Sequence, residues 1–149
     1  MRVVILGCGR VGARLANSLD SEGHQVGIID RSSEAFSQRL SPEFSGTVVV
    51  GIGIDEDVMR RAGIVGADVF AAVTNSDNTN IMASQMAKVI FAVPKVICRI
   101  YDPIRYETYR TLGLQTVSPT TLGANRVREL LESHQAKAKA VGPAPRQGG

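Results

Sequence analysis

Short apolar runs alternate along the chain with amphipathic stretches of helical spacing. The first run, Val3-Val4-Ile5-Leu6, ends at Gly7, and similar runs recur after each amphipathic stretch. Consecutive apolar residues are typical of strands buried on both faces of a parallel sheet, with helices between them. The pattern therefore predicts an α/β fold with a doubly wound parallel sheet. We expect strands at 3–6, 25–30, 47–50, 69–73, 95–100 and 115–117.

Helix start and stop signals follow each predicted strand. Apolar residues at Val11, Leu15 and Leu19 mark the inner face of the first helix. A later stretch, 78–92, has helical spacing and stops before Pro94. The first expected helix ends at Gly23, and the second begins at Ser32 or Ser33. Asp55 caps a third helix that runs to Gly63, and a fourth covers 78–92. The fifth runs from Asp102-Pro103 to about Thr111, and the last begins at Ser118-Pro119.

The chain has the size of one domain. Its 149 residues include 44% hydrophobic positions, enough for a single core. After His134 the composition changes to Ala, Lys, Gly, Pro and Gln, which is typical of disordered segments. We therefore expect a domain over 1–132 and a disordered, low-complexity tail over 133–149.

Charge and cysteine usage narrow the function classes. The net charge of +3 comes from the tail, and no Lys/Arg run with interleaved aromatic residues indicates nucleic-acid binding. No apolar run reaches the roughly 20 residues of a membrane span, so we expect a cytoplasmic protein. Cys8 and Cys98 lack metal-ligand spacing and are interpreted as buried thiols. A redox role for Cys8, at a helix N-terminus that can lower a thiol pKa, is the minor alternative.

A glycine-rich turn follows the first strand. Gly7 permits the tight turn, Gly9 lets the main chain approach a pyrophosphate, and Gly12 lets the helix pack against the strand. The helix N-terminus offers unpaired N–H groups to phosphate oxygens. The run Gly7-Cys8-Gly9-Arg10-Val11-Gly12 therefore predicts a dinucleotide site.

An acid at the end of the second strand supports this prediction. The carboxylate of Asp30 can accept both hydroxyls of an adenosine ribose and repels a 2′-phosphate, which favours NAD(H) or an adenine nucleotide over NADP(H). Its alternative role is to cap the next helix. Arg31 either lies along the adenine, accommodates a 2′-phosphate, or is a surface charge.

Two further motifs carry a family resemblance. The run from Ala72 to Ile81 and the run from Ile97 to Pro103, followed by Gly113 and Val117-Ser118-Pro119, resemble the N-terminal domain of the regulator-of-potassium-conductance family. Its members are nucleotide-binding subunits of Trk and Ktr potassium uptake systems and gating domains of potassium channels. The resemblance covers residues 1 to about 130. It implies a single Rossmann-type domain of six strands in the order 3-2-1-4-5-6 that binds NAD(H), ATP or ADP.

The resemblance also assigns roles to residues. Gly7, Cys8, Gly9, Arg10, Val11 and Gly12 match the phosphate loop. Arg10 is either a charged donor that distinguishes di- from triphosphates or a solvated arginine in the first helical turn. In the loop after the third strand, Gly51 and Ile52 are expected to give backbone and apolar contacts to the adenine. The family usually has an acid where Ile52 stands.

The remaining candidates lie after the fourth and fifth strands. Thr74, Asn75 and Ser76 follow the fourth strand, beside the switch point of the sheet, and the alternative is a helix-capping turn. Asn80 lies inside a helix, where its propensity is poor, so a polar role is expected. Arg99 lies at the ligand mouth, at a subunit contact or at a sheet edge.

These patterns favour a regulator over an enzyme. His24 lies in a turn far from the predicted site, His134 borders the tail, and no catalytic pair or triad is visible. We expect a cytoplasmic regulatory subunit that senses NAD(H) or ATP/ADP. It forms a homodimer or larger ring and gates a membrane potassium-translocating partner at the inner face of the membrane. An isolated cofactor-binding half of an NAD-dependent oxidoreductase is the alternative, and a stand-alone redox or adenylate sensor is a third possibility.

The family usually carries a second, C-terminal ligand-binding domain. Either that domain lies outside this chain, or another polypeptide supplies it, or the protein acts as a single domain.

Overall fold

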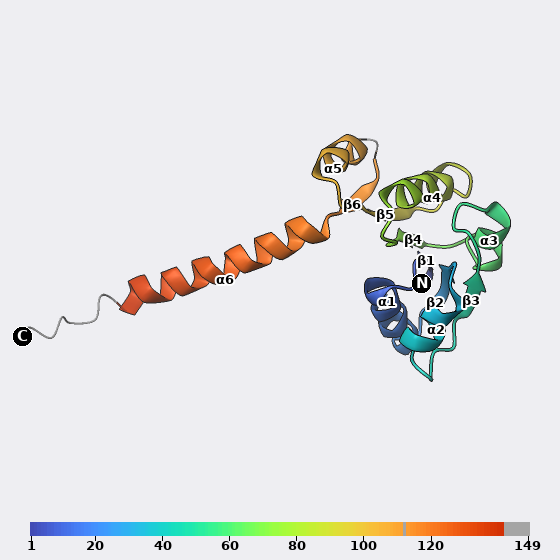
Figure 1. The fold of residues 1–149 in the computed structure, drawn as a ribbon, viewed down its shortest axis with the longest axis horizontal. Coiled ribbons are helices and arrows are strands. Elements are labelled where there is room, and N and C mark those ends of the chain that lie inside the picture. The colour runs from blue at the N-terminus through green and yellow to red at the C-terminus, as the bar shows by residue number, and fades with distance from the viewer. Residues whose placement is uncertain (112, 142–149) are drawn as a thin grey trace, which may run out of the picture. The chain divides into compact units, whose positions relative to one another are not determined.

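Six parallel strands form one sheet in the order β3-β2-β1-β4-β5-β6 (Figure 1). The computed structural model describes residues 1–111 and 113–141. The order and the parallel direction confirm the predicted fold class, and the strand limits agree with the expected ones within one residue. The strands are β1 (Arg2–Leu6), β2 (Gln25–Asp30), β3 (Thr47–Val50), β4 (Val69–Ala72), β5 (Lys95–Arg99) and β6 (Gln115–Val117).

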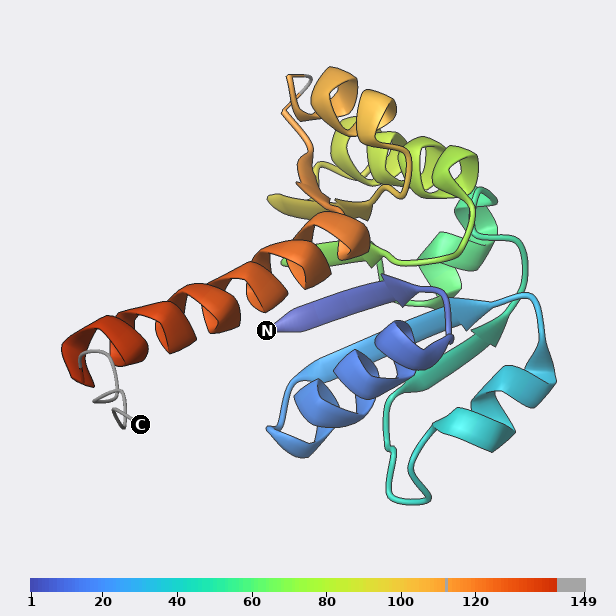
Figure 2. The ribbon, with the colours of Figure 1, turned by 60° about the vertical axis from the view of Figure 1, so that its left-hand side comes forward.

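Helices cover both faces of this sheet (Figure 2). Helices α1 and α2 pack on the face that carries Val3, Ile5 and Ile28. Helices α3 and α4 pack on the opposite face, against Leu6 and Phe70. The helices are α1 (Arg10–Ser21), α2 (Ser33–Arg39), α3 (Glu56–Arg61), α4 (Asp77–Val89), α5 (Pro103–Arg110) and α6 (Pro119–Val141).

Alternation along β1 explains why the sheet is covered on both sides. Val3 and Ile5 face α1 and α2, whereas Val4 and Leu6 face the other layer, and each is at most 3% exposed. Burial of such side chains contributes about 1.5–3 kcal/mol each. Strand β1 pairs with β2 on one side and β4 on the other, so the carboxyl ends of these strands meet at one edge of the sheet.

Helix α4 is shorter than expected. The pattern predicts a helix over 78–92, but α4 ends at Val89 and the chain turns at Ala92, whose φ is +52°. The turn places Val93 in the core beneath α4, so burial of that side chain ends the helix before Pro94.

The last helix differs from the expected tail. A disordered segment is expected from residue 133, whereas α6 continues to Val141. Alternating Ala and Lys over 136–140 are strong helix formers, and their propensity outweighs the low complexity of the segment. Residues 142–149 of the expected tail lie outside the described residues. The compact α/β unit ends at Ser118 instead of 132, and α6 belongs to a separate unit. None of the helices in the described part of the chain is both long and apolar enough to cross a membrane.

Candidate nucleotide-binding site

A cleft of about 510 Å³ opens at the carboxyl ends of β1, β2 and β4. This edge, where the strand order reverses between β1 and β4, is where doubly wound sheets bind ligands. The glycine loop forms one wall, the beginning of α2 a second, and the turn after β4 a third. The lining residues are Gly7, Cys8, Gly9, Arg10, Val11, Asp30, Ser32, Glu34, Ala35, Gln38, Arg39, Val73, Thr74, Asn75 and Arg99.

The three glycines of the loop differ in whether the structure there would tolerate a side chain. Gly7 has a φ of +108°, which L side chains rarely adopt. A Cβ on Gly12 would lie 1.7 Å from the carbonyl oxygen of Gly7, so the helix approaches the loop as closely as a glycine allows. A Cβ on Gly9 would meet nothing within 4 Å. Gly7 and Gly12 are therefore required by the fold, whereas Gly9 leaves the cleft side of the loop open.

The N-terminus of α1 faces this open space. Gly9 is the N-cap residue and provides no side-chain cap, and the first turn contains no acid. The first amides of a helix have no partner within the helix and carry partial positive charge. The loop therefore presents main-chain donors to an anion in the cleft.

Asp30 holds the end of β2 against this loop. One carboxylate oxygen accepts a hydrogen bond from the Cys8 amide at 2.8 Å, and the other accepts one from the Ser32 amide at 2.9 Å. The N-cap residue of α2 is Ser32, so the interpretation that Asp30 caps this helix is wrong; its carboxylate instead holds the turn before α2 and lines the cleft. Each oxygen retains a second lone pair for a hydroxyl donor.

Cys8 is a buried and protonated thiol. It has no exposed surface, and its Sγ lies 3.6 Å from the carbonyl oxygen of Ala35. Burial and, to a smaller extent, the charge of Asp30 raise the pKa of Cys8 to about 11, and the charge of Arg39 opposes the shift. The minor alternative of a lowered thiol pKa is therefore wrong, because burial is the largest cause of the shift and it raises the pKa. Burial also raises the pKa of the Cys98 thiol.

Asn80 supports the wall after β4 from behind. Its Oδ1 accepts hydrogen bonds from the Thr74 amide at 3.0 Å and the Thr74 hydroxyl at 2.6 Å. Its Nδ2 donates to the carbonyl oxygens of Thr74 at 3.0 Å and Arg99 at 2.9 Å. The side chain is fully buried, so the expected polar role is structural: Asn80 positions Thr74 and does not line the cleft.

Asp77 makes a similar connection one turn earlier in α4. Its carboxylate accepts hydrogen bonds from the amides of Tyr101 at 2.8 Å and Asp102 at 3.0 Å. Asp102 is the N-cap of α5 and accepts from the Ile104 amide at 3.0 Å. The capping alternative for this turn is confirmed at Ser76, the N-cap residue of α4, whose hydroxyl accepts from the Thr79 amide at 3.3 Å.

Arg99 reaches the cleft from β5. Its Nη1 donates to the carbonyl oxygen of Val73 at 3.2 Å, and its guanidinium lies 4.4 Å from the centre of the Tyr101 ring. Burial lowers the pKa of Arg99, with Asp77 opposing the shift, and Nε is buried without a hydrogen-bond partner in the described part of the chain. Arg99 thus lines the cleft, and β5 is not an edge strand because it pairs with β6.

Several expected site residues lie outside the lining of the cleft. Gly12 and Asn80 act beneath it, and Ser76 caps α4. The amide of Gly51 donates to the carbonyl oxygen of Asp30 at 3.0 Å. Arg31 and Ile52 are exposed. Sequence reasoning missed the α2 wall, although Glu34, Ala35, Gln38 and Arg39 have the spacing of one helix face directly after Asp30.

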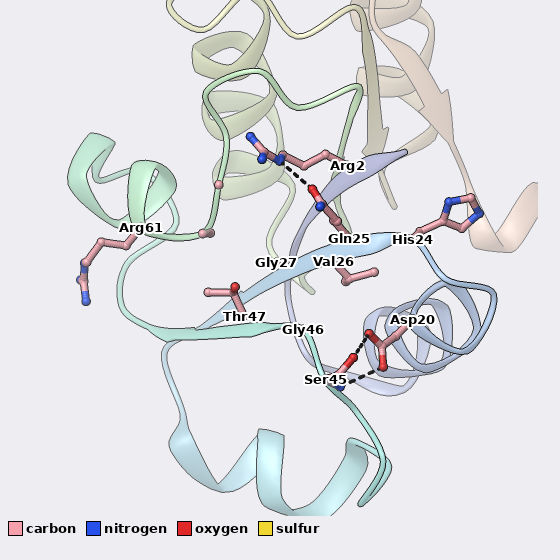
Figure 3. Close-up of a pocket in the computed structure, with 12 residues that line it drawn as sticks. Arg2, Asp20, His24, Gln25, Val26, Gly27, Ser45, Gly46, Thr47 and Arg61 are labelled. Atoms are coloured by element: carbon pink, nitrogen blue, oxygen red, sulfur yellow. Dashed lines mark hydrogen bonds between the residues drawn. The ribbon is translucent and has the colours of Figure 1, made fainter.

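A second hollow, of about 370 Å³, lies at the amino ends of β1, β2 and β3 (Figure 3). Several of its polar groups pair with one another: Asp20 accepts from the amide and hydroxyl of Ser45, and Nε of Arg2 donates to Gln25. This edge is opposite to the glycine loop. It therefore has no part in the candidate site.

The fold and the loop define a Rossmann-type domain: a doubly wound parallel sheet with a glycine turn after β1 and an acid at the end of β2. Residues 3–119 match the TrkA-N domain family, and the chain belongs to this family.

Relatives and solved structures agree with this assignment. The chain is 48% identical over 134 residues to a Trk system potassium uptake protein TrkA of Streptomyces coelicolor, covering 89% of this chain and 60% of that relative. The GsuK channel bound to NAD superposes with a TM-score of 0.73 at 27% identity, covering 91% of this chain and 24% of the other. GsuK bound to ADP gives 0.71 at 27% identity, covering 89% and 34%. The chain thus spans about 60% of the length of that curated relative.

Proposed function

We propose that this chain is the nucleotide-sensing regulatory domain of a potassium uptake system, with NAD(H) or ATP/ADP as its ligand. The observation that carries the proposal is the open face of Gly9 beside the Asp30 carboxylate in one cleft. Main-chain donors and a ribose-binding acid at this separation in the sequence are the two elements that an adenine dinucleotide site requires. The names of the relatives support the potassium system, and the NAD and ADP of the GsuK structures support the ligand class.

The residues of the cleft divide between the parts of such a ligand. The amides at the start of α1 are placed to bind a diphosphate, and Arg10 adds a charged donor beside them. Asp30 is placed to accept the ribose hydroxyls. Thr74, Asn75 and Arg99 form the opposite wall, where the second half of a dinucleotide would lie.

A regulatory role fits this cleft better than catalysis of hydride transfer. A dehydrogenase needs a proton donor near the cofactor. The described lining residues include Asp30 and Glu34 as acids and the Cys8 thiol. Asp30 is engaged with the loop, and the raised pKa of Cys8 keeps that thiol protonated and buried. Signalling requires only that a ligand bind two states of the assembly with different affinity.

A ligand panel tests the proposal directly. Calorimetric titration of the full chain with NADH, NAD, ATP, ADP and NADPH should give binding of at least one of the first four and weaker binding of NADPH. No heat and no thermal stabilisation with any of them would contradict the proposal. NADH oxidation on addition of a carbonyl compound would favour the oxidoreductase alternative instead.

Self-association and the membrane partner are further parts of the proposal. Helix α4 and its C-cap residue Ile90 expose apolar side chains, with Met82 52%, Val89 80% and Ile90 49% exposed, which suits a homodimer or a larger ring. The protein would then act from the cytoplasm, held to the inner face of the membrane by a potassium-translocating subunit. Sedimentation at micromolar concentration should show a species heavier than the monomer, and a monomer with and without nucleotide contradicts this part.

A further inference from the structure

Helix α1 carries two arginines where helix electrostatics disfavours them. Arg10 is its first residue, Arg14 lies one turn later, and the first turn contains no acid. The N-terminal end of a helix has partial positive charge, so cations there are destabilising. Like charges four residues apart also repel each other. The two arginines therefore lower the stability of the unliganded fold, and a bound anion would offset this loss.

Arg39 adds a third positive charge to the same place. Arg10, Ala13, Arg14, Asn17 and Arg39 line a hollow of about 400 Å³ between α1 and α2. Its walls are fixed to each other, because Asn17 donates to the carbonyl oxygen of Arg39 at 3.1 Å and accepts from the Ser41 amide at 2.9 Å. The hollow is therefore held by hydrogen bonds between the two helices and lined by three guanidinium groups.

No carboxylate lines this hollow, and none of its arginines forms an ion pair with a described residue. Elsewhere in the described chain, arginines of α3, α5 and α6 pair with acids three or four residues away; these pairs are Arg60–Glu56, Arg105–Asp102, Arg110–Glu107, Arg126–Glu129 and Arg128–Glu132. The arginines of the hollow lack that local neutralisation. Asp30 and Glu34 line the adjoining cleft with Arg10 and Arg39, but within the described part of the chain no ion pair joins these acids to the arginines.

The hollow also adjoins the nucleotide cleft. Arg10 and Arg39 line both, whereas Arg14 lines the hollow but not the cleft. One guanidinium group can donate two parallel hydrogen bonds to two phosphate oxygens, so several arginines suit a compact anion with several oxygens.

We propose that the hollow formed by Arg10, Arg14 and Arg39 is a second anion-binding site, which takes a phosphate group next to the nucleotide cleft. The phosphate comes either from the third phosphate of a bound nucleotide or from a separate inorganic anion. The inference deepens the proposed function. It rests on that function only if a bound nucleotide supplies the phosphate; a separate inorganic anion does not require it.

The test compares two variants with the wild-type chain by calorimetry at constant ionic strength. Arg14→Gln removes one charge from the hollow and leaves every residue of the cleft in place. Arg61→Gln is the matched control: Arg61 is an exposed helical arginine without an ion pair to a described residue, and it lines the hollow at the opposite edge of the sheet (Figure 3). Thermal melting checks that both variants fold.

With ADP at saturation to fill the glycine loop, inorganic pyrophosphate should bind the wild type and Arg61→Gln equally, and Arg14→Gln about tenfold more weakly, the loss expected for one charged hydrogen bond. ADP should bind all three proteins within twofold. If the preference for ATP over ADP falls in Arg14→Gln, the nucleotide supplies the phosphate. If that preference stays and pyrophosphate binding to the ADP-bound protein weakens, the anion is separate.

Equal affinities of the wild type and Arg14→Gln for both pyrophosphate and ATP would overturn the inference. Failure of the proposed function has a different signature. In that case neither ADP nor NADH binds the wild type, while pyrophosphate still binds and still responds to Arg14→Gln, which supports the hollow.

Discussion

The carboxylate of Asp30 accepts a hydrogen bond from the amide of Cys8 at 2.8 Å, which ties the end of β2 to the glycine loop after β1. The two walls of the cleft are thereby fixed at a single charged group. Because that group also accepts from the Ser32 amide, each of its two oxygens is bound to a main-chain amide and the carboxylate has little freedom to rotate. Its charge and its position can be tested separately.

Asp30→Asn should weaken NADH or ADP binding by about 10- to 100-fold, since a hydrogen bond to a charged group contributes about 1.5–3 kcal/mol. The same variant should narrow the gap between NADH and NADPH, because the charge that repels a 2′-phosphate is removed. Calorimetric titration measures both effects. Glu34→Gln removes an exposed acid from the same cleft and should not weaken anion binding; equal losses in the two variants would contradict a specific role for Asp30.

Gly9→Asp should abolish nucleotide binding without harming the fold. The new Cβ enters open space, and aspartate is a favourable N-cap residue, so the melting temperature should stay the same or rise. The carboxylate would occupy and repel the place of the diphosphate. Gly12→Ala is the contrasting variant: its Cβ overlaps the Gly7 carbonyl and should cost about 3 kcal/mol or more in the free energy of unfolding. Nucleotide binding by Gly9→Asp at wild-type affinity would refute the placement of the phosphate.

Asn80→Ala should lower the free energy of unfolding by about 3 kcal/mol. The variant leaves the Thr74 amide and the Arg99 carbonyl group without their partner, and unsatisfied buried groups cost about 1–3 kcal/mol each. Asn75→Ala, at an exposed position of the same turn, should change stability by no more than about 0.5 kcal/mol. Urea unfolding distinguishes the two. Equal stabilities would mean that Asn80 does not hold the turn.

The stability of the protein should fall between pH 9 and pH 11 because of Cys8. The folded thiol has a pKa raised to about 11, against an ordinary value of 9.0. The unfolded state therefore loses this proton first, and stability that is present below pH 9 is lost as the pH rises through 11. Two pKa units correspond to about 2–3 kcal/mol. Urea unfolding at pH 8, 9 and 10.5 should show a shallower decline for Cys8→Ala than for the wild type, and parallel declines would exclude the buried thiol as the cause.

Sequence reasoning predicted the features that local patterns encode. The six strands follow from apolar runs, and the place of Gly7, Gly9 and Asp30 beside one cleft follows from a turn whose geometry constrains residue choice. The α2 wall of the cleft was missed because the orientation of Gln38 and Arg39 depends on how α2 packs against α1. The role of Asn80 was only partly predicted, since its partners lie in two separate segments, the turn after β4 and the end of β5. The pKa of Cys8 depends on burial, which its position at a helix N-terminus does not reveal.

The side chains of Asn80 and Asp77 connect the turn after β4 by hydrogen bonds to the end of β5 and to the residues before α5. Asn80 holds Thr74 to the end of β5, and Asp77 holds the two amides that precede α5. A shift of this turn on contact with a bound molecule would pull on the first residues of α5 through these bonds, while the paired strands stay in register. The contacts of Asn80 and Asp77 thus join the wall of the cleft to the residues that begin α5.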